Sequence, residues 1–308
     1  VEYCYNEATI NANFCVGGLI GKNEAIVQYC YNTGNITGTG GDTGGLIGIS
    51  SNSPSYCYNT GQVSGYQYVG GLIGSGSANN CYNLGPVTGD DHVGGLLGSG
   101  NASYCYNAGE VTYTGWGEYI GGITGFSSSS TTACYYDKNT SGQSEDGGES
   151  HGLSTMLMQM EYQYRTEHSY QDDWDFMTES SSGIWGISPI VNDGYPFLSW
   201  QGYELYGTEP DGSGTTEDPY VVDDLADLYW ISQKIERWDD HYIQSCDINA
   251  TVTTSWCNGS GFLPLGVGDI NDEFSGTYDG QEHVISNLWI NREHEYDVGF
   301  IGKSSAFD

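Results

Sequence analysis

Residues Tyr56 to Gly74 read YCYNTGQVSGYQYVGGLIG, and variants of this stretch follow one another along the first half of the chain. The glycine that opens the second phrase of each variant recurs at Gly17, Gly44, Gly70, Gly94 and Gly121. The steps between these glycines are 27, 26, 24 and 27 residues. Repeats of nearly fixed length are typical of folds in which each repeat stacks on its neighbours. The repeat therefore decides the fold class.

Within one repeat the side chains alternate in character with a period of two. Cys57 lies between two tyrosines, and Val63 lies between two polar residues. Alternation of this kind, broken by Asn and Gly turns, is typical of short β-strands. The units lack the leucine ladder and the helical segment of a leucine-rich repeat. The sequence predicts an all-β fold, a parallel β-helix (β-solenoid) with coils of 24 to 27 residues and short capping α-helices.

Stacked coils would place equivalent side chains about 4.8 Å apart, so that each repeated residue becomes a ladder. The inward ladder is expected to consist of Cys4, Cys30, Cys57, Cys81, Cys105 and Cys134. Plain packing is the favoured role for these thiols, because cysteine is often a small buried apolar residue. Disulfides between coils and a metal array are the alternatives.

Tyrosines are expected to form the outer face. An exposed aromatic stripe is predicted at Tyr31, Tyr58, Tyr82 and Tyr106, and a second stripe at Tyr3, Tyr29, Tyr56 and Tyr104. Three explanations stay open for them: the ordinary preference of tyrosine for strands, contact with a neighbouring filament or a glycan, and capture of a ligand.

The composition excludes several classes of partner. Asp and Glu number 40 against 7 Lys and Arg, which gives a net charge of −33, although charged residues make up only 15% of the chain. Such a surface repels nucleic acid and attracts divalent cations. No stretch approaches the roughly 20 apolar residues of a membrane span. We therefore expect no nucleic-acid partner and no membrane-spanning segment in this chain.

The motifs of common enzymes are absent from the sequence: there is no His-Glu-x-x-His, no Gly-x-Ser-x-Gly and no phosphate-binding loop. The rival interpretation is a β-helical polysaccharide lyase or glycosidase that uses paired carboxylates. Candidates are Asp90–Asp91, Asp172–Asp173 and the group Asp269, Asp272 and Glu273. This last group is also the candidate for a structural Ca²⁺ ion, against solvated acidic turns as the plainer alternative. We expect no enzyme activity and no other cofactor.

Two further features fit an exported protein. Cys246 and Cys257 flank a Thr/Ser-rich loop outside the cysteine ladder, and a disulfide between them is predicted. Candidate N-glycosylation sequons are also present. They lie at Asn35, Asn101, Asn139, Asn249 and Asn258. An extracellular or cell-surface location, with a coat of glycans, is the expectation.

The repeat phrases CYNTGNITG, CYNTGQVSG and CYNAGEVTY, each with its Gly-Gly-Leu-Ile-Gly-like partner, resemble the GLUG-motif repeats of bacterial and archaeal surface proteins. Residues Cys134 to Ser144 and the stretch NDGYPFLSW (Asn192 to Trp200) resemble the segment that closes such repeat blocks. Gly214 to Tyr220 resemble the opening of the family pattern loosely, and Phe274 to Arg292 resemble its first full coils. The resemblance implies a surface-exposed solenoid.

The family order is permuted in this chain, since the opening segment comes last. The resemblance implies repeat coils over residues 1–142, a closing segment over 143–201, a linker over 202–219, and an opening cap helix with the first coils over 220–308. The nine residues after Gly299 and the seventeen up to Gly17 together make 26, which is within the internal repeat range. A sequence cut from a tandem array, and separate subunits that meet head to tail, both explain this register.

These observations predict a structural unit of an extracellular filament, fibril or stalk, with identical units as its partners. The alternative is an adhesin or carbohydrate-binding module that uses the tyrosine stripes. Stacked coils explain the first function, because each coil end presents an edge that another coil can cover.

Overall fold

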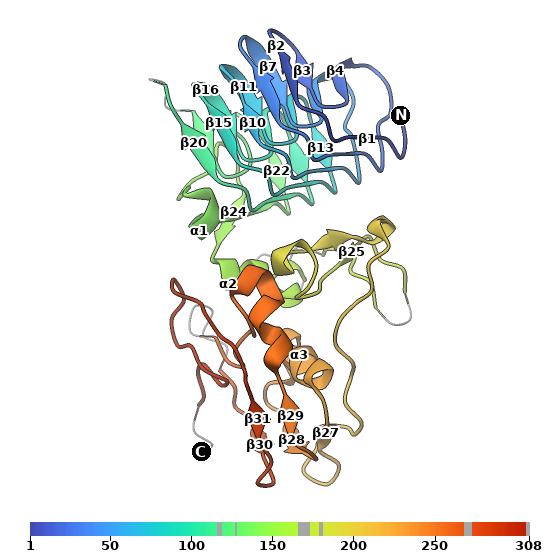
Figure 1. Cartoon of the computed structure of the whole chain (residues 1–308), viewed down its shortest axis with the longest axis vertical. Helices are drawn as coiled ribbons and strands as arrows, with labels where there is room; N and C mark the ends of the chain where they lie inside the picture. Colours follow the sequence, from blue (N-terminus) through green and yellow to red (C-terminus); the bar gives the residue numbers. More distant parts are fainter. Residues whose placement is uncertain (116–118, 127, 166–172, 179–180, 268–272, 306–308) are drawn as a thin grey trace. The chain divides into compact units, whose positions relative to one another are not determined.

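The computed structural model describes residues 1–115, 119–126, 128–165, 173–178, 181–267 and 273–305. It divides into two compact units: unit 1 is Val1–Met158, and unit 2 is Gln159–Asp308 (Figure 1). Among the described residues, no helix is long and apolar enough to cross a membrane.

Unit 1 is a parallel β-helix, so the predicted fold class is confirmed. Its described residues form five sheets that run along the stack of coils, and every strand pair in them is parallel (Figure 1). Each sheet collects the equivalent strand of successive coils. The register follows the sequence repeat, because Tyr31 pairs with Tyr58, Val63 with Val87, and Gly70 with Gly94.

The first sheet has seven strands. It contains β1 (Tyr5–Asn6), β5 (Tyr31–Asn32), β9 (Tyr58–Asn59), β14 (Tyr82–Asn83), β19 (Tyr106–Asn107), β23 (Tyr135–Asp137) and β24 (His151–Leu153). The second has five: β2 (Ile10–Ala12), β6 (Ile36–Gly38), β10 (Val63–Ser64), β15 (Val87–Gly89) and β20 (Val111–Tyr113).

The remaining sheets of unit 1 cover the other sides of the coils. One contains β3 (Val16–Gly17), β7 (Gly41–Gly44), β11 (Gln67–Gly70), β16 (Asp91–Gly94) and β21 (Ile120–Gly121). Another contains β4 (Ile20–Asn23), β8 (Ile47–Ser50), β12 (Ile73–Ser75) and β17 (Leu97–Ser99). The last contains β13 (Ala78–Asn79), β18 (Ala102–Ser103) and β22 (Thr131–Thr132).

The core of unit 1 consists of stacked identical side chains. Leu46, Leu72 and Leu96 lie one above another with 0% exposure, and the cysteine ladder lies in the same cluster. A second apolar cluster is the valine stack that contains Val63, Val87 and Val111. The repeated glycines are required by close backbone contact. A Cβ atom on Gly70 would lie 2.1 Å from the carbonyl oxygen of Ile73 and 2.6 Å from the amide nitrogen of Gly98.

A buried asparagine ladder joins the coils next to the cysteines. Its members are Asn6, Asn32, Asn59, Asn83 and Asn107. In each step the amide nitrogen donates to the amide oxygen of the next coil, at 2.7–2.9 Å. Each amide also closes a local turn with the backbone two residues on, as Asn59 does with Gly61. The ladder ends where Tyr136 takes the equivalent position beside Asn107.

Two short helices follow the coils of unit 1. Helix α1 (Lys138–Ser141) begins at Asp137, whose carboxylate accepts hydrogen bonds from the amides of Asn139 and Thr140. Helix α2 (Thr155–Met158) follows Ser154 and buries Met156 and Leu157.

Unit 2 contains the capping helix and a second set of parallel strands. Helix α3 (Leu225–Gln233) begins after Asp224 and lies in the region where an opening cap helix is expected. Strands β27 (Tyr220–Val222), β28 (His241–Gln244) and β30 (Thr277–Asp279) form one parallel sheet, and β29 (Ile248–Asn249) pairs in parallel with β31 (Ile285–Ser286). Strands β25 (Trp185–Gly186) and β26 (Phe197–Leu198) are antiparallel. Five 3₁₀ segments are η1 (Glu161–Tyr164), η2 (Asn192–Gly194), η3 (Ser199–Gln201), η4 (Ile235–Arg237) and η5 (Thr251–Gly259).

The closing and opening segments fold together in unit 2. The guanidinium of Arg292 is buried and donates to the side-chain oxygen of Gln159, 133 residues away in sequence, and to the carbonyls of Gly261 and Phe262. Gln233 donates to the carbonyl of Gln159, and its own side-chain oxygen accepts from the backbone amide of Glu161. The sequence predicts separate closing and opening segments, whereas the structure has both in unit 2. This polar network joins them and explains the difference.

The predicted linker over residues 202–219 also differs from expectation, because part of it packs. The ring of Tyr206 lies edge-on against Tyr229 at 5.5 Å and Trp256 at 5.0 Å between centroids. Asp211 forms an antiparallel bridge with Val221. An aromatic side chain in a Gly- and Pro-rich stretch is the physical reason, since burying it on α3 removes apolar surface from water.

Candidate functional site

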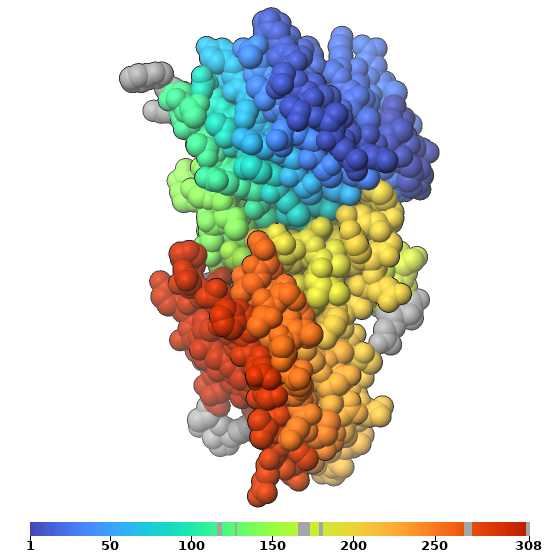
Figure 2. Space-filling view, in the orientation of Figure 1, coloured from blue at the N-terminus to red at the C-terminus, as the bar shows by residue number. Residues whose placement is uncertain are grey.

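The first coil of unit 1 is the open edge of the β-helix. Strands β1, β2, β3 and β4 each stand at the end of their sheets in the described structure, so each has a partner strand on one side. The residues of this coil form the dark-blue surface of unit 1 in Figure 2. An edge of this kind offers unused backbone donors and acceptors to another strand.

Apolar side chains are exposed on the same edge. Tyr3, Tyr5 and Phe14 expose 66%, 55% and 68% of their surface. Leu19 is half-buried, whereas the equivalent Leu46 of the next coil has 0% exposure. The edge therefore exposes side chains that inner coils bury, and a further coil of the same kind would cover them.

Unit 2 has an open coil edge of its own. Strand β30 is the end strand of its sheet in the described structure. In the described residues, the chain that follows β31 forms only single bridges: Gly261 with Ile290, Leu265 with Ile301, and Phe274 with Ser304. Trp289 and Tyr296 are exposed by 45% and 75% in this region. Both units thus present a coil edge with exposed aromatic residues.

Tyrosine rings form two stacks in unit 1. In the first stack, which includes Tyr5 and Tyr31, neighbouring rings lie 4.9–5.1 Å apart with interplanar angles of 1–7°. In the second, Tyr3, Tyr29 and Tyr56 are 4.9 and 5.1 Å apart and have φ values of 52° to 56°. Asn80, with a similar φ, stands where the next coil of this second stack would carry a tyrosine.

The expectation that Tyr31, Tyr58, Tyr82 and Tyr106 form an exposed stripe is corrected by the structure. Tyr82 and Tyr106 have 0% exposure, and Tyr31 and Tyr58 are half-buried. Stacking is the main reason, because each inner ring is covered on both faces by its neighbours. The second stack keeps more of its surface, with Tyr3 exposed and Tyr29 and Tyr56 half-buried.

The six ladder cysteines lie on the inner face of the coils. Cys30, Cys57, Cys81 and Cys105 have 0% exposure, Cys134 has 1%, and Cys4 at the open edge is half-buried. The sulfurs of Cys30, Cys81 and Cys105 each accept from the backbone amide of the preceding cysteine, at 3.4–3.5 Å. Burial raises the pKa values of the Cys57 and Cys105 thiols. The six ladder cysteines are free thiols, and their place in the apolar cluster fits packing.

The disulfide predicted between Cys246 and Cys257 is not formed, and both thiols are free. Cys246 is exposed, and its sulfur donates to the carbonyl of Asp223. Cys257 is buried, and its amide donates to the carbonyl of Pro189. Packing against the closing segment, which the sequence did not reveal, directs Cys257 inward.

The carboxylates considered for catalysis or Ca²⁺ form separate local contacts. Asp90 accepts from the hydroxyl of Thr114, and Asp91 lies 2.9 Å from the ring nitrogen of His92. Glu273 forms an ion pair with Lys303 at 3.0 Å. Asp172, Asp269 and Asp272 lie outside the described residues, and Asp173 is exposed.

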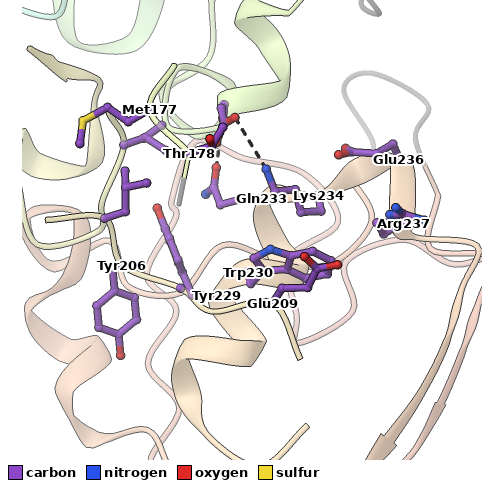
Figure 3. A pocket seen from close by; sticks show the side chains of 14 residues that line it. Met177, Thr178, Tyr206, Glu209, Tyr229, Trp230, Gln233, Lys234, Glu236 and Arg237 are labelled. Carbon is purple, nitrogen blue, oxygen red and sulfur yellow. Dashed lines mark hydrogen bonds and ion pairs between the residues drawn. The ribbon is translucent and has the colours of Figure 1, made fainter. Parts of the chain in front are cut away.

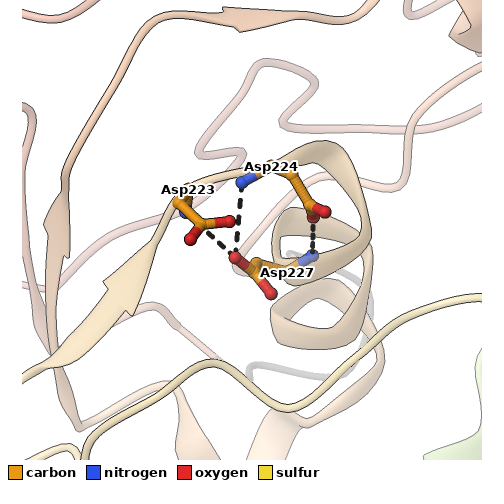
Figure 4. A group of neighbouring side chains, drawn as sticks. All are labelled: Asp223, Asp224 and Asp227. Atoms are coloured by element: carbon orange, nitrogen blue, oxygen red, sulfur yellow. Dashed lines mark hydrogen bonds between the residues drawn. The ribbon is translucent and has the colours of Figure 1, made fainter.

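A group of three carboxylates that the sequence did not single out as a site stands before α3. Among the described residues, the ligand atoms of Asp223, Asp224 and Asp227 lie within 4.8 Å of one another (Figure 4). Asp224 accepts from the amide of Ala226 at 2.7 Å and from that of Asp227 at 3.0 Å, while Asp227 accepts from the amides of Asp223 and Asp224. This arrangement is a helix capping box, which explains the cluster without an ion.

All five predicted glycosylation asparagines are exposed. Asn249 and Asn101 use their side-chain oxygens to accept backbone hydrogen bonds, from Thr251 and Ser130 respectively. Modification at any of them stays a prediction.

Comparison with known proteins agrees with this repeat structure. The family model of the GLUG motif matches residues 12–37, which contain β3 to β5. A stretch of 95 residues, 30% of this chain, is 42% identical to halomucin from Haloquadratum walsbyi (strain DSM 16790 / HBSQ001). The chain spans about 1% of the length of that relative. No solved structure matches the chain.

Proposed function

We propose that the chain, whose residues 12–37 match the GLUG motif, is a structural unit of an extracellular filament or cell-surface stalk. Its coils would stack head to tail, with the open coil of unit 2 covering the first coil of an identical unit 1. The observation that carries this proposal is the pair of open coil edges, each with exposed aromatic residues. The stacked units can belong to one continuous polypeptide with tandem repeats or to separate subunits, and the contact between coils is the same in both.

The geometry of unit 1 supports this stacking. Rings in the tyrosine stacks lie about 5 Å apart, close to the ~4.8 Å spacing of neighbouring strands. A further coil at that spacing would cover Tyr3 and Tyr5 and bury Leu19. The asparagine ladder has the same direction in every step, with Nδ2 donating toward the later coil. At the edge, the side-chain oxygen of Asn6 accepts from the amide of Ala8 alone among the described residues, so it retains room for a donor from a preceding coil.

Surface location and chemistry belong to the proposal as well. The net charge of −33 would keep such fibres soluble and apart from one another. We propose that the chain acts without catalysis and without a required cofactor. A structural Ca²⁺ ion near Glu273 and glycans on the exposed sequons are compatible with this role. Asp224 and Asp227 cap helix α3, and Glu273 forms an ion pair with Lys303. These contacts support structural roles for the three acidic residues.

Self-association of the 308-residue chain tests the proposal. We expect its sedimentation coefficient to rise with concentration as coils stack end to end. Leu19→Lys, which places a charge on the open edge, should reduce this association, whereas Gln62→Lys, at an exposed site of an inner coil, should leave it intact. A wild-type chain that stays monomeric over the whole concentration range would refute head-to-tail assembly.

The alternative function, carbohydrate binding, is favoured by one observation. The second tyrosine stack ends at Tyr3, which is 66% exposed and has the ring of Tyr29 on one face, and sugars bind to open aromatic faces. Glycan-array binding that is lost in Tyr3→Ser would support this function. Binding that survives the substitution would exclude this stack as the site.

A further inference from the structure

Unit 2 contains a cavity of about 350 Å³ beside helix α3 (Figure 3). Its walls come from three parts of the sequence: the closing segment, the stretch around Tyr206, and residues 229–237 of α3 and η4. The volume is at the small end of the range of about 300–1,000 Å³ for small-molecule sites. It belongs to a different region from the coil edges and the tyrosine stacks.

Cations are concentrated around this cavity, in a chain that has only 7 Lys and Arg. Lys234 and Arg237 line it, and Arg165 lies behind Glu161, which also lines it. Arg165 and Lys234 share the single carboxylate of Glu161, while Arg237 is 3.6 Å from Asp240. Arg165 and Lys234 therefore share one acceptor on this side of the cavity, while Glu209 and Glu236 line the cavity elsewhere.

Lys234 is the more distant of the two cations from the Glu161 carboxylate. Its side chain is only 23% exposed, and its ammonium nitrogen is 3.7 Å from the carboxylate oxygen of Glu161. This distance is too long for a hydrogen bond, and the described residues offer the ammonium no closer acceptor. Burial, followed by the charge of Arg165, lowers the pKa of Lys234. A ligand carboxylate in the cavity would supply the missing acceptor.

The rest of the lining fits a sugar ring. The indole of Trp230 is half-buried and lies next to Lys234 in Figure 3, with Glu209 near it. Glu209 and Glu236 are exposed at the rim and can accept hydrogen bonds from hydroxyl groups. Aromatic faces mixed with charged donors and acceptors suit a ligand that has apolar C–H faces and many hydroxyls. A purely apolar ligand would leave these polar groups unpaired.

We propose that this cavity binds a single acidic monosaccharide of the uronate type. The ring lies on Trp230, the ligand carboxylate accepts from the ammonium of Lys234, and the rim glutamates accept from ring hydroxyls. The site would let a chain with a strongly anionic surface hold one anionic sugar at a defined place. It does not depend on head-to-tail stacking, because every residue it uses lies within unit 2.

Three sugars with the same ring and different charge test the proposal on the full chain: glucuronate, glucose and glucosamine. Calorimetry should show that glucuronate binds about tenfold or more tighter than glucose, since a hydrogen bond to a charged partner contributes ~1.5–3 kcal/mol. Glucosamine should bind most weakly. This comparison uses the wild-type protein, so it does not depend on the folding of a variant.

Substitution then assigns the residue. Lys234→Gln should reduce glucuronate affinity to the level of glucose, while Lys22→Gln, which removes an exposed lysine of unit 1 that pairs with Glu24, should change nothing. Circular dichroism of both variants checks folding. No binding of glucuronate, equal affinity for glucuronate and glucose, a preference for glucosamine, or full glucuronate affinity in Lys234→Gln would each overturn the proposal.

Discussion

The asparagine ladder is expected to be a major source of stability in unit 1, and Asn83 is the position at which to measure it. Asn83 has 0% exposure and takes part in four hydrogen bonds. It accepts from Asn59 at 2.8 Å and from the amide of Gly85 at 3.2 Å, and it donates to the carbonyl of Gly85 at 2.7 Å and to Asn107 at 2.9 Å. Asn83→Ala removes all four.

The expected cost is worked from those bonds. A hydrogen bond contributes a net ~0.5–1.5 kcal/mol, and a buried group left without its partner costs more. Four lost bonds therefore give about 4 kcal/mol of lost unfolding free energy. Asn6→Ala removes three bonds at the half-buried edge, where water can replace the partners, and should cost about 1 kcal/mol. Asn35→Ala, at an exposed site, should cost less than about 0.5 kcal/mol.

Urea denaturation followed by far-ultraviolet circular dichroism measures these differences. The midpoints and slopes of the three variants are compared with those of the wild-type chain, because a changed slope would show that unfolding has become non-cooperative. The reasoning is wrong if Asn83→Ala loses less than about 1 kcal/mol, or if Asn6→Ala costs as much as Asn83→Ala.

Three further predictions concern other parts of the structure. Gly70→Ala should destabilise unit 1 by more than about 2 kcal/mol, because its Cβ would lie 2.1 Å from a backbone oxygen, whereas Gly280→Ala, with nothing within 4 Å, should be near neutral; equal melting temperatures would contradict this. Asp224→Ala removes the cap of α3 and should cost about 1 kcal/mol, measured by thermal unfolding against Asp247→Ala as control. Burial raises the pKa values of Cys57 and Cys105, so these thiols ionise at lower pH in the unfolded chain than in the folded one. The unfolding free energy should therefore fall as pH rises above about 9, and it should fall less steeply in Cys57→Ala. An unfolding free energy that does not change with pH in this range would refute the prediction.

The repeat predicted unit 1 well because its fold is set by local alternation that recurs in every coil. The inward direction of Cys57 and Val63 and the parallel register of Tyr31 with Tyr58 follow from period and spacing alone. The same alternation also places Asn59 on the inner face, two residues after Cys57. That ladder was missed because a polar residue was not considered for the core, although identical amides in successive coils can satisfy one another.

The sequence was less informative about unit 2. Arg292 and Gln159 are 133 residues apart in sequence, and no local pattern links them. The inward turn of Cys257 depends on the closing segment, and the cavity beside Lys234 is built from three separated segments. The positive φ values at Tyr3, Tyr29 and Tyr56 also could not be predicted from the alternation of side chains. Long-range packing of this kind is specified by tertiary contacts and not by period.

Cryo-electron microscopy of the native material tests head-to-tail stacking of the coils. We expect filaments in which the open coil of unit 2 lies about 4.8 Å from the first coil of the next unit 1, with the tyrosine and asparagine ladders continuing across the joint. Continuous main-chain density at that joint would identify a tandem array, and a break would identify separate subunits. Discrete particles whose coil edges stay uncovered would contradict the claim.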